Sequence, residues 1–185
     1  MVSTPSLRGR LLVATPVLRD GTFDRTVILL LEHGDDGAVG VVLNRPSDLD
    51  VGGPLPEWRS AAAEPGVVFV GGPVAQGGAI CLGRAASVAA DGWEPVVGAV
   101  GVVDLSRPAS DVLGMVEEVR VFTGYAGWGG GQLEGELQAG AWLVLTAEPG
   151  DALSADPESL WRTVLRRQPG PVSWLANYPE DPSLN

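Results

Sequence analysis

Three short stretches of the sequence carry residues that could do chemistry, and the first surrounds His33, the one histidine. It stands between Glu32 and the pair Asp35-Asp36. An imidazole beside carboxylates could act as a general base or hold a metal ion. Glu32 and His33 are consecutive at an expected strand end, so their side chains should point to opposite faces. Zinc and iron sites generally use more nitrogen or sulfur ligands. We therefore predict no metal site and keep His33 as the catalytic candidate.

The second stretch, Asn44-Arg45-Pro46, ends an expected hairpin with a cation. Arg45 precedes a proline, which restricts its backbone to extended conformations. A guanidinium held in this way suits a carboxylate or phosphate group. We expect a salt bridge to one of the 23 acidic residues of the chain more than a ligand contact.

The third stretch, FTGYAGWGGGQLEGEL at residues 122–137, places three consecutive glycines before an expected helix. A Walker A loop needs Lys and Ser or Thr after its last glycine, whereas a glutamine and a leucine follow here. Free amides at a helix N-terminus could still bind an anion. Glu134 and Glu136 would repel it, however, and instead complement the helix dipole. We predict a structural corner, with a polar ligand site on the backbone amides as the alternative.

Other catalytic arrangements find less support. Glu134 and Glu136 are two residues apart, about 200° around a helix, so they should not form an acid pair. No serine lies in a G-x-S-x-G elbow. Cys81, the single cysteine, sits in the apolar run AICLG, where cysteine usually behaves as a small core residue. A Cys81–His33 dyad is the alternative.

The elements that must position these residues follow from the hydrophobic pattern and from Gly and Pro. The continuous apolar run TVILLLE is typical of a strand buried on both faces. Tight turns join some strands and helices join others, which predicts an α+β domain with a mixed sheet, and glycines inside strands predict strong curling. The expected strands are 11–14, 26–32, 38–43, 67–70, 79–82, 96–105, 119–123 and 142–146. The expected helices lie within 54–63, 110–118, 131–139 and 156–167.

Length and charge restrict the class of protein. The 185 residues suit a single domain, 1–185, with a loose arm at 1–8 and a frayed tail at 179–185. The formal net charge is −11, which opposes direct nucleic-acid binding. The longest apolar run, Val27–Leu31, is too short to span a bilayer. We expect a cytoplasmic protein with no membrane contact and no cofactor.

Several stretches together resemble the YqgE/AlgH family of small bacterial proteins. They are GRLLVATPVLRDGTFDRTVILLLEHGDDGAVGVVLNRP, VFVGGPV and GYAGWGGGQLEGEL, in this order. The resemblance implies one α+β domain whose bifurcated sheet folds into a pseudo-barrel, and a cytoplasmic location. It also brings the label of transcriptional regulator, which we interpret as indirect regulation through protein contacts, because the chain shows no DNA-reading motif.

Matching the family pattern selects nine positions: His33, Asn44, Arg45, Gly71, Gly72, Pro73, Trp128, Gln132 and Glu134. We predict that the polar members line one cleft at the hairpin ends, with Trp128 as a wall, and that the protein binds a small polar ligand or a protein partner. The ligand-binding set is Asn44, Arg45, Trp128, Gln132 and Glu134. The alternative is a hydrolase-like enzyme with His33 as general base and Glu134 orienting it.

Overall fold

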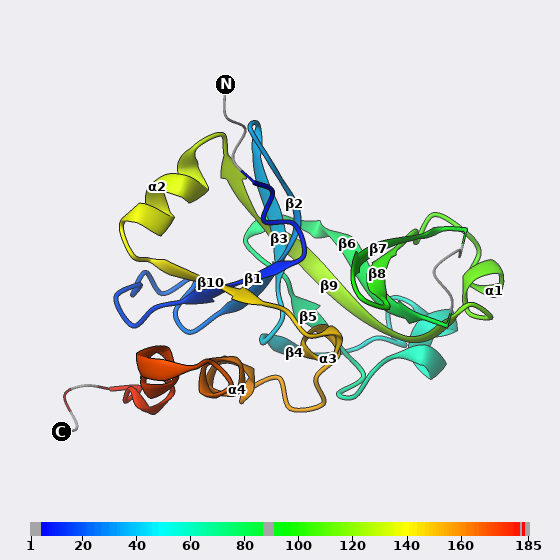
Figure 1. Ribbon diagram of the computed structural model, residues 1–185. Helices are drawn as coiled ribbons and strands as arrows, with labels where there is room; N and C mark the ends of the chain where they lie inside the picture. Colours follow the sequence, from blue (N-terminus) through cyan, green and yellow to red (C-terminus); the bar gives the residue numbers. More distant parts are fainter. Residues whose placement is uncertain (1–4, 87–90, 182, 184–185) are drawn as a thin grey trace.

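The computed structural model describes residues 5–86, 91–181 and 183, and a curled sheet dominates it (Figure 1). The strands are β1 Arg10–Ala14, β2 Val27–Gly34, β3 Gly37–Val42, β4 Pro46–Asp50, β5 Val67–Val70, β6 Val74–Ala85, β7 Trp93–Val97, β8 Val100–Val103, β9 Val116–Gly129 and β10 Trp142–Thr146. The α-helices are α1 Ala109–Val112, α2 Gln132–Gln138, α3 Pro149–Ala152 and α4 Leu160–Arg166, and the 3₁₀ helices are η1 Pro56–Ala61 and η2 Gly170–Asn177.

The long strand β9 divides the sheet into branches. Near its end, residues 126–129 pair with β3, which continues to β2, β1 and β10. Nearer its start, β9 pairs antiparallel with β6, which continues to β8 and β7. It also pairs in parallel with β5, whose other neighbour is β4. The predicted α+β class and the curled, bifurcated sheet are therefore confirmed.

Three glycines make the branching possible. Gly71 and Gly72 lead from β5 toward β6 and cross β9 beside Gly124. A Cβ on Gly71 would lie 2.4 Å from the carbonyl oxygen of Gly124, and one on Gly72 would lie 2.1 Å from the carbonyl carbon of Tyr125. Gly124 itself has φ +69°, a left-handed conformation that glycine adopts without strain. The two family motifs that contain these glycines thus form one tight backbone contact.

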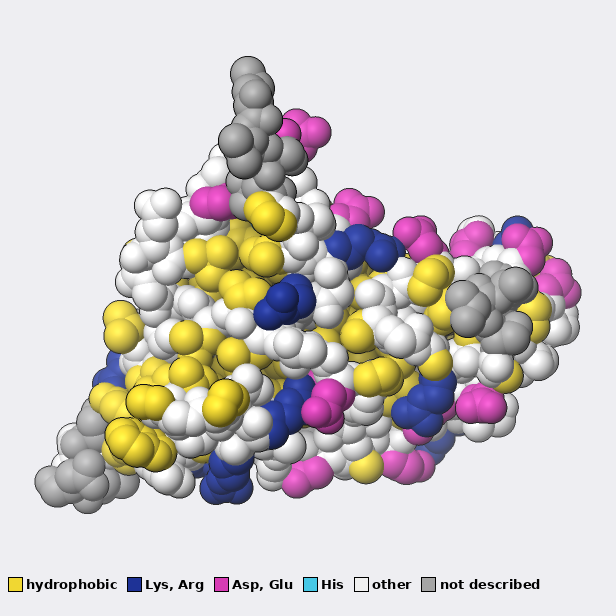
Figure 2. All heavy atoms as spheres, in the orientation of Figure 1, with side chains coloured by type: hydrophobic (Ala, Val, Ile, Leu, Met, Phe, Trp, Pro, Cys, Tyr) yellow, Lys and Arg dark blue, Asp and Glu magenta, His cyan; other side chains and the backbone are white. Residues whose placement is uncertain are grey.

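The strands β1 to β3 are largely buried on both faces, and for β2 the run TVILLLE predicted this burial. Leu11 and Leu29 belong to a hydrophobic cluster that includes Val164 of α4. Leu12 and Ile28 point to the other side, into a cluster with Leu133 of α2. Hydrophobic side chains remain visible on the face that carries β1 and β10 (Figure 2).

Three expected elements differ from the structure. The stretch GYAGWG, which follows the strand expected at 119–123, is not a loop but the end of β9, because pairing with β3 continues to Gly129. The single strand expected at 96–105 is a hairpin, β7 and β8, that turns at Gly98 with φ +55°. The helix expected at 110–118 ends at Val112, because Val116 already starts the pairing of β9 with β6. In each case strand pairing decided the local conformation.

The start of the described chain is also fixed, so the expected loose arm is wrong for residues 6–8. The hydroxyl of Ser6 donates to the carbonyl oxygen of His33 at 3.0 Å. The amide of Leu7 donates to Nδ1 of His33, also at 3.0 Å. Residues 1–4 of the expected arm, and residues 182, 184 and 185 of the expected tail, lie outside the described residues.

Candidate functional site

The predicted site residues lie at opposite ends of the β2–β3 hairpin. His33 is near the turn and pairs with Ala38, whose other neighbour is Trp128 on β9. Asn44 is at the open end, where its Oδ1 accepts from the amide of Val27 at 3.0 Å. His33 is six positions after Val27 in β2, about 20 Å at the usual rise of ~3.3 Å per residue. The prediction of one cleft containing all of them is wrong, because hairpin ends are separated by the strand length.

At the turn end, His33 connects the N-terminal segment to α2. Its Nδ1 accepts from the amide of Leu7, so this nitrogen carries no proton, and the proton of the neutral ring lies on Nε2. Nε2 then donates to Oε1 of Glu134 at 2.9 Å. The side chain of His33 is only 2% exposed. The basic nitrogen is therefore both occupied and buried.

The carboxylate of Glu134 is held in its charged form. Its own backbone amide and the His33 side chain both donate to it, and they lower its pKa below the ordinary value. A carboxylate that orients a histidine is part of many general-base pairs. Here Nδ1, the other ring nitrogen of His33, accepts from the backbone amide of Leu7 and does not face an open space. This arrangement is unfavourable for a general base.

Glu136, the second glutamate of α2, binds two residues of an aromatic cluster. Oε2 of Glu136 accepts from the indole nitrogens of Trp128 at 2.9 Å and of Trp142 at 2.8 Å. The two indole rings are 6.0 Å apart, and Phe23 contacts both. Glu134 and Glu136 thus point to different partners, as their spacing on a helix predicted.

Gln132 completes the corner between β9 and α2. Its Oε1 accepts from the amide of Gly129 at 3.1 Å, and its Nε2 donates to Oε1 of Glu136 at 3.1 Å. Gly131 has φ +76° and precedes the helix, so it provides the left-handed turn that a larger residue would resist. The polar atoms of Gln132 and Glu136 are therefore engaged within the corner, in agreement with a structural role for the glycine stretch.

The open end of the hairpin has a different character. Asn44 uses its amide group to bind the loop before β2, since its Nδ2 donates to the carbonyl oxygen of Arg25 at 2.9 Å. Arg45 reaches the same loop. Its Nη1 donates to the carbonyl oxygen of Thr22, and its Nη2 lies 3.5 Å from that of Asp24. The expected salt bridge is thus replaced by contacts with backbone carbonyls.

Two further arginines lie near Arg45. The guanidinium carbon of Arg25 is 4.6 Å from the centre of the Trp161 ring, and that of Arg162 is 6.0 Å from it. Arg25 has φ +54°, which is uncommon for a residue other than glycine. Its Nη2 donates to the carbonyl oxygen of Tyr178 at 2.7 Å. Tertiary contacts therefore hold Arg25 in a strained backbone conformation.

These arginines line one pocket of about 170 Å³ between the hairpin end and α4. We call it the arginine pocket. Its lining residues are Asp24, Arg25, Asn44, Arg45, Glu158, Trp161, Arg162 and Glu180. The nearest ion pair in it joins Arg162 and Glu180 at 3.7 Å. Among the residues that the structure describes, no carboxylate forms an ion pair with Arg25 or Arg45.

The surroundings of Arg25 and Arg45 disfavour the charged form of both guanidinium groups. Burial lowers the pKa of Arg25, and the charge of Arg162 lowers it further. Burial also lowers the pKa of Arg45, against the opposing effect of Asp24 and Asp20. Both groups would gain from a nearby negative charge. Sequence reasoning identified Arg45 but missed Arg25, Arg162 and Trp161, because no local motif marks them.

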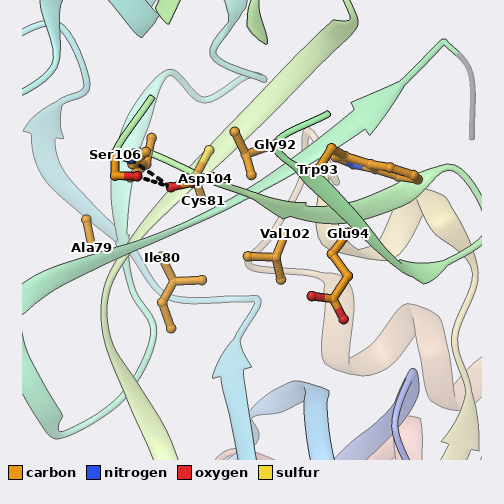
Figure 3. Close-up of a pocket in the computed structure, with 11 residues that line it drawn as sticks. Ala79, Ile80, Cys81, Gly92, Trp93, Glu94, Val102, Asp104 and Ser106 are labelled. Atoms are coloured by element: carbon orange, nitrogen blue, oxygen red, sulfur yellow. Dashed lines mark hydrogen bonds between the residues drawn. The ribbon is translucent and has the colours of Figure 1, made fainter. Parts of the chain in front are cut away.

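A larger pocket of about 610 Å³ lies over β6, β7 and β8 (Figure 3). Its polar side chains are already engaged. Glu94 pairs with Arg8 at 3.0 Å, and Asp104 accepts from the amide and the hydroxyl of Ser106. Cys81 is buried at its edge, and burial raises the pKa of its thiol to about 12. A thiol in this state is a poor nucleophile, so Cys81 does not suit the role of a catalytic nucleophile in this pocket.

Two negative findings apply to the residues within 5–86, 91–181 and 183. No group of three or more His, Cys, Asp or Glu side chains there could hold a metal ion. No helix in this part of the chain has the length and apolar character needed to cross a membrane.

The fold and the two hairpin ends define a small α+β protein built on a bifurcated, half-barrel sheet. The sequence pattern of the AlgH-like family, DUF179, matches residues 11–173, and the chain belongs to this family. The UPF0301 protein SCO2948 of Streptomyces coelicolor is 54% identical over 190 residues, which cover 100% of this chain and 98% of that relative.

Two solved structures share the fold. The crystal structure of protein DIP2367 from Corynebacterium diphtheriae is 31% identical and superposes with a TM-score of 0.88, over 95% of this chain and 93% of the other. The solution structure of the AlgH protein from Pseudomonas aeruginosa is 29% identical, with a TM-score of 0.70 and 98% of both chains covered. These relatives support the family assignment, and their names state no reaction.

Proposed function

We propose that the protein is a binding protein for a small anion and that the arginine pocket is its binding site. One observation carries the proposal: Arg25 and Arg45 point into one pocket without an ion-pairing carboxylate among the described residues, although the chain has a formal net charge of −11. In such an acidic protein, two partly buried cations without an ion-pairing carboxylate favour a ligand that supplies the negative charge.

The available donors define the ligand group. A guanidinium has five N–H donors, and the hydrogen bonds described above use one on Arg25 and two on Arg45. The remaining donors form a fork that matches a carboxylate or a phosphate. Trp161 also lines the pocket, but it is 2% exposed and Arg25 covers its ring, so it offers the ligand little apolar area.

The acidic residues of the pocket restrict the ligand further. Asp24, Glu158 and Glu180 line the same 170 Å³. A ligand that is only anionic would meet them unfavourably, whereas one that also carries a hydroxyl or ammonium donor could satisfy both signs. The proposed ligand class is therefore a small carboxylate or phosphate with such a donor. Nucleic acid does not fit, because the net charge opposes a long polyanion.

The test is a thermal-shift titration of the full chain with inorganic phosphate and with glycine, each compared with sodium chloride at equal ionic strength. A ligand that binds only the folded protein raises its melting temperature. We expect a saturable rise with at least one probe, and an affinity at least about tenfold lower in Arg45→Ala and Arg162→Ala.

The matched control is Arg59→Ala. Arg59 is exposed on η1 and pairs with Asp50 at 3.1 Å, outside the pocket. The Arg59→Ala variant should bind the probe as the wild type does. Equal weakening of all three variants, or no shift beyond that of chloride with any probe, would overturn the proposal.

A further inference from the structure

The strand β10 forms an open edge of the sheet. It pairs with β1 on one side, and no described strand lies on its other side. The amide of Thr15 donates to the carbonyl oxygen of Ala141 at 2.9 Å, which fixes the residues that face β1. Because hydrogen-bonding directions alternate along a strand, Leu143 and Leu145 bond to β1. The amides and carbonyls of Trp142 and Val144 then point outward.

The other sheet edges carry residues that oppose pairing. Strand β10 itself carries none, although Nη2 of Arg167 donates to the carbonyl oxygen of Thr146 at one end of the strand, at 3.2 Å. Strand β7 contains Pro95, and its pairing with β8 is irregular there. Strand β4 begins with Pro46 and carries Asp48 and Asp50. Prolines, charges and bulges are the usual means by which proteins prevent edge strands from pairing. The sequence of β10, WLVLT, has none of these.

We propose that a second copy of this chain pairs with β10 in antiparallel orientation about a two-fold axis at Val144. In this register Trp142 lies opposite Thr146 of the copy, and the outward groups of both strands form about six backbone hydrogen bonds. In two of them the carbonyl oxygen of Thr146 accepts a second bond, beside the one from Nη2 of Arg167. A two-fold contact uses the same surface on both copies, which suits a short strand of nearly symmetric sequence.

The charges at the two ends of β10 complement one another in this arrangement. Arg10 lies at the Thr146 end, where its Nε donates to the carbonyl oxygen of Leu145. Glu136 lies at the Trp142 end, bonded to the indole of Trp142. Antiparallel pairing brings the Arg10 end of one copy beside the Glu136 end of the other. Because Glu136 already accepts from Trp128, Trp142 and Gln132 of its own chain, this is a long-range attraction and not a direct ion pair. The strand itself is uncharged, so the two acidic proteins can approach along it.

Apolar surface next to the strand supplies further area. A groove of about 480 Å³ near Gly140, just before β10, is lined by Pro16, Val17, Leu175 and Tyr178, among others. Val17 is 77% exposed and Trp174, beside Leu175, is 72% exposed. Figure 2 shows hydrophobic side chains on both sides of the line that β10 follows in Figure 1. Five paired residues alone would not reach the roughly 1,000 Å² of a specific interface, and this surface adds to them.

The first test is amide hydrogen exchange of the full chain at low and high protein concentration. We expect the amides of Trp142 and Val144 to exchange rapidly in dilute protein and to become protected at high concentration. Leu143 and Leu145 should be protected at both, because they bond to β1. Sedimentation of the same samples should show a monomer converting to a dimer. A chain that stays monomeric, or a dimer in which Trp142 and Val144 still exchange rapidly, would overturn the proposal.

The second test is a pair of variants. Val144→Lys places a charge at the centre of the edge and should abolish the dimer while the melting temperature of the monomer shows that the chain folds. Leu49→Lys introduces the same positive charge at an exposed residue of another edge strand, β4, and this variant should dimerise as the wild type does. Dimerisation by Val144→Lys at wild-type strength would contradict the proposal. If Val144→Lys does not fold, the exchange pattern of the wild type decides alone.

Discussion

Nε2 of His33 lies 2.9 Å from Oε1 of Glu134, although 101 residues separate them in the chain. With the bond from Leu7 to Nδ1, the imidazole holds together the N-terminal segment, the β2 end and α2. This histidine is therefore a connecting residue of the fold.

His33→Ala should destabilise the protein by about 1–3 kcal/mol, because it leaves the Leu7 amide and the Glu134 carboxylate without their partner. Urea unfolding followed by tryptophan fluorescence measures the loss. Ser6→Ala removes an exposed hydrogen bond to the same residue and should cost less than about 0.5 kcal/mol. Equal stability of the two variants would show that the buried imidazole contributes nothing beyond its surface neighbour.

Glu134→Gln should make the stability of the protein depend less on pH in the acid range. The pKa of Glu134 is lowered in the folded protein from an ordinary value of 4.5, so its stabilising effect is fully present above that pH. It is lost as the pH falls through the lower, folded value. Melting temperatures of the wild type and Glu134→Gln should therefore differ most near neutral pH and converge in acid. A difference that stays constant or grows below pH 4.5 would be inconsistent with this linkage.

Arg120→Ala should be among the most damaging substitutions. Arg120 is 2% exposed, and its guanidinium donates to the carbonyl oxygens of Glu64, Ala152 and Ser154. It also lies over the Phe69 ring at 4.3 Å. Its removal leaves these carbonyls unsatisfied and opens a cavity, which should cost about 3 kcal/mol or more in the free energy of unfolding.

The matched comparison for Arg120 is Arg84→Ala on the adjacent strand. Arg84 forms a partly exposed ion pair with Glu118 at 3.1 Å, and such pairs contribute about 1 kcal/mol or less. Denaturant unfolding of both variants should separate them clearly. Similar losses of unfolding free energy would show that the hydrogen bonds of Arg120 to three carbonyls contribute no more than the partly exposed ion pair of Arg84.

Cys81 should be unreactive in the folded protein. Burial raises the pKa of its thiol to about 12, so the reactive thiolate is scarce at pH 8. A chromogenic disulfide reagent should label Cys81 only after denaturant is added. Labelling of the native protein at the rate of an exposed thiol would reveal opening of the β6 region.

Much of the fold was predictable because it depends on local pattern. Apolar runs bounded by Gly and Pro located β1, β2, β3, β5 and β10, and the Glu134–Glu136 spacing correctly placed their side chains on different sides of α2. Prediction failed where a distant strand decided the outcome. Residues 124–129 have the composition of a loop, yet pairing with β3 makes them strand.

The sequence by itself determined the composition of the core, the acidic charge, the family and the residue types of the candidate site. Only the tertiary structure decided which of those residues meet. It joined His33 to Glu134 and separated both from Arg45, because a hairpin brings its strands together sideways but keeps its two ends a strand length apart. It also brought Arg25 and Arg162 to Arg45 from positions 20 and 117 residues away, a proximity that depends on chain packing and leaves no local mark in the sequence.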